Sequence, residues 1–129
     1  MPCPRIDAVS VTTADMSRSI AFYSALGFDF SAADPSQDHV EPATPPGGTR
    51  LMIDSAALAE KLTGRAPVPA SHSAFALLCA SPAEVDALAG AVESAGFTVE
   101  TQPWDAFWGQ RYAVLRDPEG YLVDLFAPL

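Results

Sequence analysis

The strongest constraint on the fold is an order of structural signals that occurs twice along the 129 residues. In each half, an apolar strand pattern leads into a helical pattern with a polar N-cap residue, and a Gly-Phe pair ends the helix. The two glycines of these pairs, Gly27 and Gly96, lie 69 residues apart, and the glycines of the later turns, Gly48 and Gly120, lie 72 residues apart. Because order, helix stops and turns recur together, the sequence predicts two similar modules.

The patterns also predict where the elements of each module lie. In the first module we expect strands, one of them weak, and two helices, in the order 5–12 (strand), 15–26 (helix), 28–32 (strand), 39–41 (weak strand), 49–54 (strand) and 55–62 (short helix). In the second we expect the order 71–79 (strand), 81–95 (helix), 97–102 (strand), 103–109 (aromatic loop), 110–116 (strand) and 121–126 (strand). The fold class is therefore α+β, with the one-sided apolar faces of the helices packed on sheets.

A Gly- and Pro-punctuated stretch over residues 63–69 separates the modules. We expect module one to span about residues 5–62 and module two about residues 70–127, both within a single domain over residues 1–129.

Composition and charge exclude several classes of protein. A chain with 49% hydrophobic and 18% charged residues is predicted to be globular. Its net charge of −9 opposes binding to nucleic acid or to an anionic membrane surface. The two cysteines, Cys3 and Cys79, do not make a disulfide framework, and neither a secretory signal nor an apolar run of membrane-spanning length occurs. We therefore expect a cytoplasmic protein.

A carboxylate in the last predicted strand is the first candidate site residue. Residues 117–120 read Asp-Pro-Glu-Gly, a turn in which proline fixes one φ and glycine permits a positive one. Asp124 follows among apolar neighbours. Since burial of an unpartnered carboxylate is costly, Asp124 faces solvent, a cavity, a cation or a hydrogen-bond donor.

Three segments, taken together, resemble one known family. They are residues 6–15 leading into residues 19–28, residues 72–75 ahead of the second helix, and residues 117–120 with residues 123–125. In this order and spacing they resemble the vicinal oxygen chelate superfamily, which includes glyoxalase I, extradiol dioxygenases and the bleomycin- and fosfomycin-resistance proteins. The resemblance implies two βαβββ modules whose sheets curl into a half-open cup. The scaffold hosts many activities, so the resemblance does not specify the chemistry.

The resemblance also implies where a metal would bind, and this sequence departs from that pattern. Family metal ligands come from the first and last strands of each module, which correspond here to Ala8, Met52, His72 and Asp124. Ala8 cannot ligate, and the Met52 thioether is a poor ligand for Mg, Mn, Fe or Zn. His39 or Glu41 are the remaining candidates for a third ligand. We expect no metal and no other cofactor, because a catalytic site normally needs about three protein ligands.

His72 and Asp124 each allow a structural and a functional interpretation. His72 fits a half-buried, hydrogen-bonded strand residue, and Asp124 fits an ion pair with Arg50, Arg111 or Arg116. If both instead face the cup, they form a metal-free acid/base pair in which the carboxylate orients the imidazole.

Four aromatic side chains crowd into nine residues just before the final hairpin: Trp104, Phe107, Trp108 and Tyr112. Such a cluster is typical of core or lid packing. In a cup-shaped fold, the same cluster is suited to close over a flat or cationic ligand, because ring faces attract cations. With Met52, these residues are the predicted ligand-binding set.

Two functions remain open. One is a small-molecule-binding protein of the antibiotic-resistance type, which sequesters an aromatic or cationic compound without turnover. The other is an enzyme of the same superfamily, a lyase, isomerase or dioxygenase with a degenerate or metal-free site. In either case we expect a homodimer, since a half-open cup leaves sheet edges that invite pairing with another chain.

Overall fold

The computed structural model describes residues 5–68 and 74–129, so His72 lies outside the described residues. The first module contains β1 (Ala8–Thr13), α1 (Met16–Ala25), β2 (His39–Val40), β3 (Arg50–Ser55) and α2 (Ala56–Thr63). The second contains β4 (Ala74–Leu78), α3 (Pro82–Ser94), β5 (Thr98–Ala106), β6 (Gln110–Arg116) and β7 (Leu122–Pro128). This α+β content confirms the predicted fold class.

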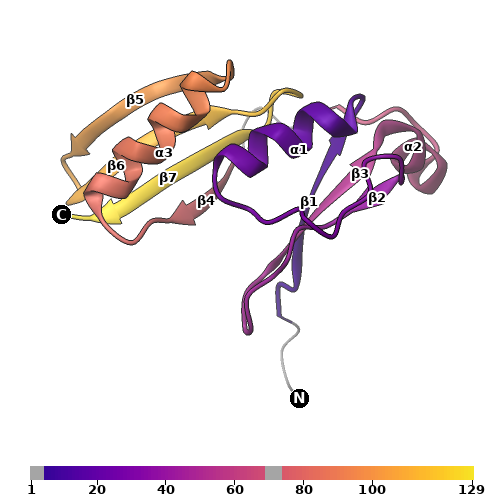
Figure 1. Cartoon of the computed structure of the whole chain (residues 1–129), viewed down its shortest axis with the longest axis horizontal. Coiled ribbons are helices and arrows are strands. Elements are labelled where there is room, and N and C mark those ends of the chain that lie inside the picture. Colours follow the sequence, from indigo (N-terminus) through magenta and orange to yellow (C-terminus); the bar gives the residue numbers. More distant parts are fainter. Residues whose placement is uncertain (1–4, 69–73) are drawn as a thin grey trace.

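Within the described residues, the strands form two separate open sheets, one for each module (Figure 1). The three-stranded sheet has the order β1-β3-β2, and the four-stranded sheet has the order β4-β7-β6-β5. In both sheets the first strand pairs in parallel with the last, and the remaining pairs are antiparallel. The repeat seen in the sequence is thus a repeat of strand connectivity.

Both long helices begin at the caps that the sequence predicts. The Asp15 side chain accepts a hydrogen bond from the Arg18 amide at 3.2 Å, and that of Ser81 accepts one from the Glu84 amide at 3.2 Å. The Glu84 carboxylate in turn accepts a hydrogen bond from the amide of Ala80, the residue before the N-cap, which is a variation on the capping box.

The strand predicted over residues 28–32 does not form, and this prediction was wrong. Asp29 Oδ1 accepts a hydrogen bond from the Ser31 amide at 2.9 Å, and the Ala33 amide bonds the Phe30 carbonyl at 2.9 Å. These local bonds close a turn in place of a strand ladder, since short polar side chains compete with secondary structure for backbone groups. Module one therefore has three strands where the resemblance implied four.

The aromatic segment 103–109 is not the predicted loop either. β5 continues to Ala106, which pairs with Gln110, because its pairing with β6 resumes at Trp104 after two register irregularities. Residues 107–109 form a turn, with Gly109 at a φ of +89°. The aromatic side chains are consequently held by a strand and a tight turn.

One hydrophobic core joins the two modules. Side chains from both sheets and both long helices contribute to it, among them Phe22, Ile53, Val85 and Leu125. A second connection comes from the turn at residues 117–120, which lies against module one.

Asp117 and Glu119 of that turn, together with Tyr121 just after it, form side-chain hydrogen bonds to module one. The Tyr23 hydroxyl donates to Asp117 Oδ2 at 2.9 Å, and the Thr13 hydroxyl donates to Glu119 Oε1 at 3.0 Å. The hydroxyls of Thr12 and Tyr121 are 3.0 Å apart. Burial raises the pKa of both Tyr23 and Asp117. The turn that the sequence identified by its glycine and proline is thus also the clamp between the modules.

Across the ranges 5–68 and 74–129, no helix is both long enough and apolar enough to cross a bilayer.

Candidate functional site

The candidate site lies on the face of the four-stranded sheet that points away from α3. Side chains alternate across a strand, so Leu115, Val123 and Leu125 pack into the core while their neighbours face the other way. The outward side chains fall into rows across the strands. One row runs through Trp104, Tyr112, Phe126 and Leu78. Each of these residues is the cross-strand partner of the next.

We call this surface the aromatic face, defined by that row together with Trp108, Phe107 and Asp124. Its aromatic rings contact one another edge to face. The ring centroids of Trp108 lie 5.6 Å from Trp104, 5.2 Å from Tyr112 and 5.0 Å from Phe107. Trp104 is 40% exposed and Trp108 is 47% exposed. Large rings that remain this accessible are available to a ligand, because they are not buried in the hydrophobic core.

Asp124 lies in the next row of the same face, between Val114 on β6 and Ala76 on β4. The Tyr112 hydroxyl donates a hydrogen bond to Asp124 Oδ2 at 2.8 Å. Partial burial, and then the carboxylate, raise the pKa of Tyr112 to about 12, so the phenol stays protonated and keeps donating at neutral pH. Asp124 Oδ1 makes no hydrogen bond to any residue in the described ranges.

The structural interpretation of Asp124 as an arginine partner is wrong for all three arginines. Arg50 pairs with Asp7 and Glu41. Arg111 pairs with Asp86 and Asp105, and Arg116 pairs with Glu100. The acid therefore has a phenol as its partner, which no local sequence pattern indicates.

The structure brings together five of the seven predicted site residues and places one, Met52, elsewhere. Those together are Trp104, Phe107, Trp108, Tyr112 and Asp124. Met52 lies on β3 of the other sheet, opposite Ser10 on β1. His72 lies outside the described residues, so its pairing with Asp124 stays a prediction.

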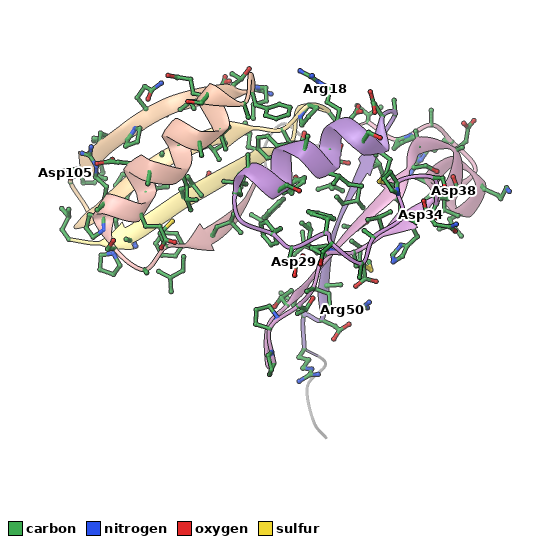
Figure 2. All side chains as sticks on the ribbon, viewed as in Figure 1. Arg18, Asp29, Asp34, Asp38, Arg50 and Asp105 are labelled. Atoms are coloured by element: carbon green, nitrogen blue, oxygen red, sulfur yellow. The ribbon has the colours of Figure 1, made fainter. Side chains whose placement is uncertain are left out.

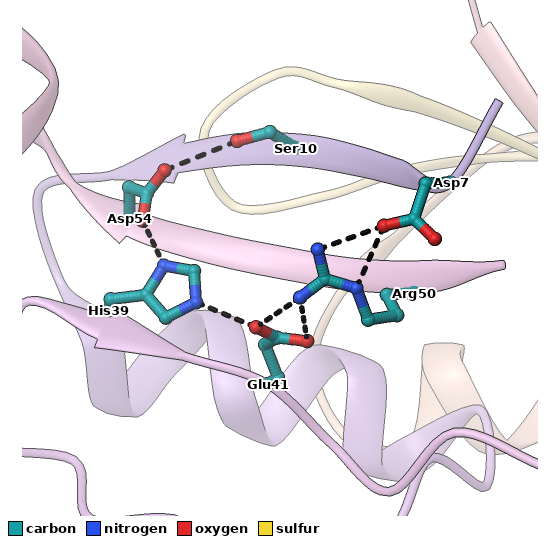
Figure 3. Close-up of polar contacts among 6 residues, drawn as sticks. All are labelled: Asp7, Ser10, His39, Glu41, Arg50 and Asp54. Carbon is teal, nitrogen blue, oxygen red and sulfur yellow. Dashed lines mark hydrogen bonds and ion pairs between the residues drawn. The ribbon is translucent and has the colours of Figure 1, made fainter. Parts of the chain in front are cut away.

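The outward face of the three-stranded sheet carries a second cluster, which we call the polar face (Figure 3). Its six side chains, each hydrogen-bonded to the next, are Ser10, Asp54, His39, Glu41, Arg50 and Asp7. His39 is bonded at both ring nitrogens, to Asp54 Oδ1 at 2.5 Å and to Glu41 Oε2 at 2.8 Å. The sequence patterns indicate His39 and Glu41 only as possible metal ligands and do not predict this cluster.

The electrostatics of the polar face follow from these contacts. Hydrogen bonds to Glu41 and then Asp54 raise the pKa of His39, and the bond to His39 lowers the pKa of Glu41. Arg50 donates to both Glu41 oxygens, at 3.1 and 2.9 Å. Each of the three carboxylates thus has a hydrogen-bond partner within the cluster, either Arg50 or His39.

The described residues do not fit the metal site that the superfamily pattern implies. Ala8 has no donor atom, and Met52 offers only a thioether. Across residues 5–68 and 74–129, no three His, Cys, Asp or Glu side chains converge in an arrangement able to hold a metal ion. Of the family ligand positions, Asp124 alone offers an oxygen or nitrogen donor within those ranges.

Comparisons with known proteins agree with this fold. The model of the Glyoxalase/Bleomycin resistance protein/Dioxygenase superfamily matches residues 5–125. No curated protein matches the chain.

Many solved structures are similar. A glyoxalase/bleomycin resistance protein/dioxygenase from Nocardioides has 26% identity and a TM-score of 0.76, over 100% of this chain and 86% of that one. A glyoxalase-related enzyme from Fulvimarina pelagi has 18% identity and a TM-score of 0.83, over 97% and 88%. A lactoylglutathione lyase from Agrobacterium tumefaciens has 21% identity and a TM-score of 0.70, over 98% and 95%. The last two likenesses concern the fold alone.

Proposed function

Since the chain belongs to the glyoxalase/bleomycin resistance protein/dioxygenase superfamily, we propose that it binds a small aromatic cation on the aromatic face and sequesters it without turnover. The observation that carries this proposal is the exposed edge-to-face set of Trp104, Trp108 and Tyr112 next to the Asp124 carboxylate. An antibiotic or a similar compound with a flat charged ring has the required chemistry.

The chemistry of the face favours a cation over a neutral or anionic ring. Ring faces attract cations with roughly 0.5–2 kcal/mol for each good contact. The Asp124 carboxylate adds a full negative charge, and its Oδ1 retains both lone pairs within the described part of the chain. Phe107, which is 91% exposed, lies at the turn beside Trp108 and extends the apolar surface.

The hydrogen bond between Tyr112 and Asp124 supports binding over acid/base chemistry by the phenol. Tyr112, with its pKa raised to about 12, is a poor base near neutral pH and acts as a fixed donor to Asp124. This arrangement positions the carboxylate, as a recognition site requires.

Titration of the tryptophan fluorescence with N-methylacridinium tests the proposal. Both tryptophans of the chain lie on the aromatic face, so we expect saturable quenching. Tetraethylammonium, a cation without a ring, is the control and should compete weakly. The absence of saturable quenching by N-methylacridinium would refute the proposed function.

We also propose that the protein is a two-fold homodimer. Among the described strands, β1 and β2 end one sheet and β4 and β5 end the other, and unpaired edges favour association with a second chain. Sedimentation velocity should give the mass of a dimer, and a monomer that persists at tens of micromolar would contradict the proposal.

A further inference from the structure

A groove adjoins the aromatic face at β4. It has a volume of about 950 Å³ and lies between the end of α1, the segment before β3, and β4 with the start of α3. Its apolar lining includes Leu26, Phe28, Leu78 and Leu88. This volume is within the range of drug-sized ligand sites.

Leu78 belongs to both surfaces. It lines the groove, and it is also the last member of the row Trp104, Tyr112, Phe126 and Leu78. Four adjacent strands spaced about 4.8 Å apart make this row roughly 14 Å long. At 69% exposure, Leu78 leaves an apolar path open from the tryptophans to the groove.

The charged residues of the groove are acidic. Asp29 and Glu84 line it, and within the described ranges no Lys or Arg does. The Glu84 carboxylate already accepts a hydrogen bond from the Ala80 amide. Asp29 lies on the exposed loop after α1 (Figure 2), and hydrogen bonds from Ser31 lower its pKa, so it is ionised at neutral pH. The groove thus offers a second negative charge, separated from Asp124 by an apolar surface.

We propose that the ligand is an elongated dication, with an aromatic cation on the aromatic face, an apolar body across Phe126 and Leu78, and an ammonium group at Asp29. This inference rests on the proposed function and specifies its ligand class. A compact aromatic cation uses only one end of the site. A compound that also carries an amine at the end of a long apolar chain uses both ends.

A series of N-alkylacridinium ions tests this inference. Their linear tails increase in length and end either in a primary ammonium or in a hydroxyl group, and affinity is measured by quenching of tryptophan fluorescence. We expect the two tails to bind equally when short. Once the tail reaches the groove, the ammonium compound should bind about three- to fivefold more tightly, which is the size expected of an exposed ion pair.

Asp29→Asn should remove this difference and leave N-methylacridinium binding unchanged. Asp34→Asn is the matched control, because Asp34 makes the same turn, with its Oδ1 accepting from the Ser36 amide at 2.9 Å, and does not line the groove (Figure 2). As a second variant, Leu78→Asn should weaken the long-tailed compounds more than N-methylacridinium, because the tail crosses the Leu78 side chain on its way to the groove.

The outcomes separate the two proposals. If N-methylacridinium binds but long ammonium tails give no gain, or if Asp29→Asn and Asp34→Asn behave alike, the elongated dication is refuted and the proposed function stands. If N-methylacridinium itself fails to bind, the proposed function is refuted, and the ligand class with it.

Discussion

The polar face and the aromatic face are the outward surfaces of two sheets with the same parallel pairing of first and last strands, yet they use charge in opposite ways. On the polar face, carboxylates alternate with nitrogen groups along the chain Asp54, His39, Glu41, Arg50 and Asp7, each bonded to the next. On the aromatic face, Asp124 receives one hydrogen bond from the described residues, that of Tyr112, and its strand partners Val114 and Ala76 carry no charge.

Under the proposed function, this difference separates a supporting face from a binding face. The polar face bonds a two-residue strand, β2, and the irregular chain beside it to β3, through His39 with Asp54 and Glu41 with Arg50. The charged groups of the polar face are bonded to one another within module one. The aromatic face keeps a charge and its rings accessible, and that is the arrangement a ligand requires.

The largest expected effect comes from removal of the hydrogen bonds that Asp117 accepts at the junction of the two modules. Asp117 is 3% exposed and accepts from the Tyr23 hydroxyl and from the amides of Glu119 and Tyr121. Asp117→Ala leaves these donors without a partner, so we expect a loss of about 3 kcal/mol in the free energy of unfolding and a fall in Tm of roughly 10 °C.

Thermal and urea unfolding measure this effect. Asp105→Ala is the control, because Asp105 is exposed and Arg111 keeps its second partner, Asp86. A stability within about 0.5 kcal/mol of wild type for Asp117→Ala, the size of an ordinary surface substitution, would show that the clamp does not hold the modules together.

Removal of a ring from the aromatic face should have the next largest effect. Trp104→Ala deletes one of the exposed rings, and we expect N-methylacridinium to bind about tenfold more weakly, or about 1.4 kcal/mol. Calorimetric titration measures this without relying on tryptophan emission.

Two further variants sharpen the comparison. Leu62→Ala removes an apolar side chain that is 72% exposed on α2 and should leave binding unchanged. We expect the same of Met52→Ala. A loss in Met52→Ala equal to that in Trp104→Ala would extend the site onto the polar face.

A smaller effect is expected from titration of the polar face. The pKa of His39 is raised above its ordinary 6.5 in the folded state. The stabilisation is therefore complete below that ordinary value and is lost as pH rises through the raised one. Because His39 is 43% exposed, we expect a loss below about 1 kcal/mol.

Urea unfolding across this range should show the decline in wild type, and His39→Gln should remove it. An NMR titration of the ring should give a pKa above 6.5. An unperturbed His39 would mean that the two carboxylates do not hold the imidazole in solution.

The sequence predicted most of the fold because its signals are local. The caps at Asp15 and Ser81 and the helix stops at Gly27 and Gly96 need only neighbouring residues, and they are where the patterns indicated. The prediction of a strand over residues 28–32 was wrong because the apolar pattern was given more weight than a local turn signal. That signal is Asp29, whose side chain accepts a hydrogen bond from the Ser31 amide.

The site was harder to predict, because its contacts join distant strands. The aromatic cluster and Asp124 are close in sequence and could be found together. Tyr112 donating to Asp124 depends on the β6–β7 register, and His39 bonding Asp54 depends on β2, which pairs over two residues. Such a short strand has no pattern of its own, so the polar face could not be predicted.

The most direct test of the central claim, that Asp124 and not the polar face recognises the ligand, compares Asp124→Asn with Asp54→Asn. Each variant is titrated with N-methylacridinium and with acridine, which is neutral at mildly alkaline pH and has nearly the same shape. We predict that Asp124→Asn weakens the cation about fivefold and leaves acridine within about twofold, while Asp54→Asn changes neither. Equal losses of both probes in Asp124→Asn, or a loss of the cation in Asp54→Asn, would contradict the account.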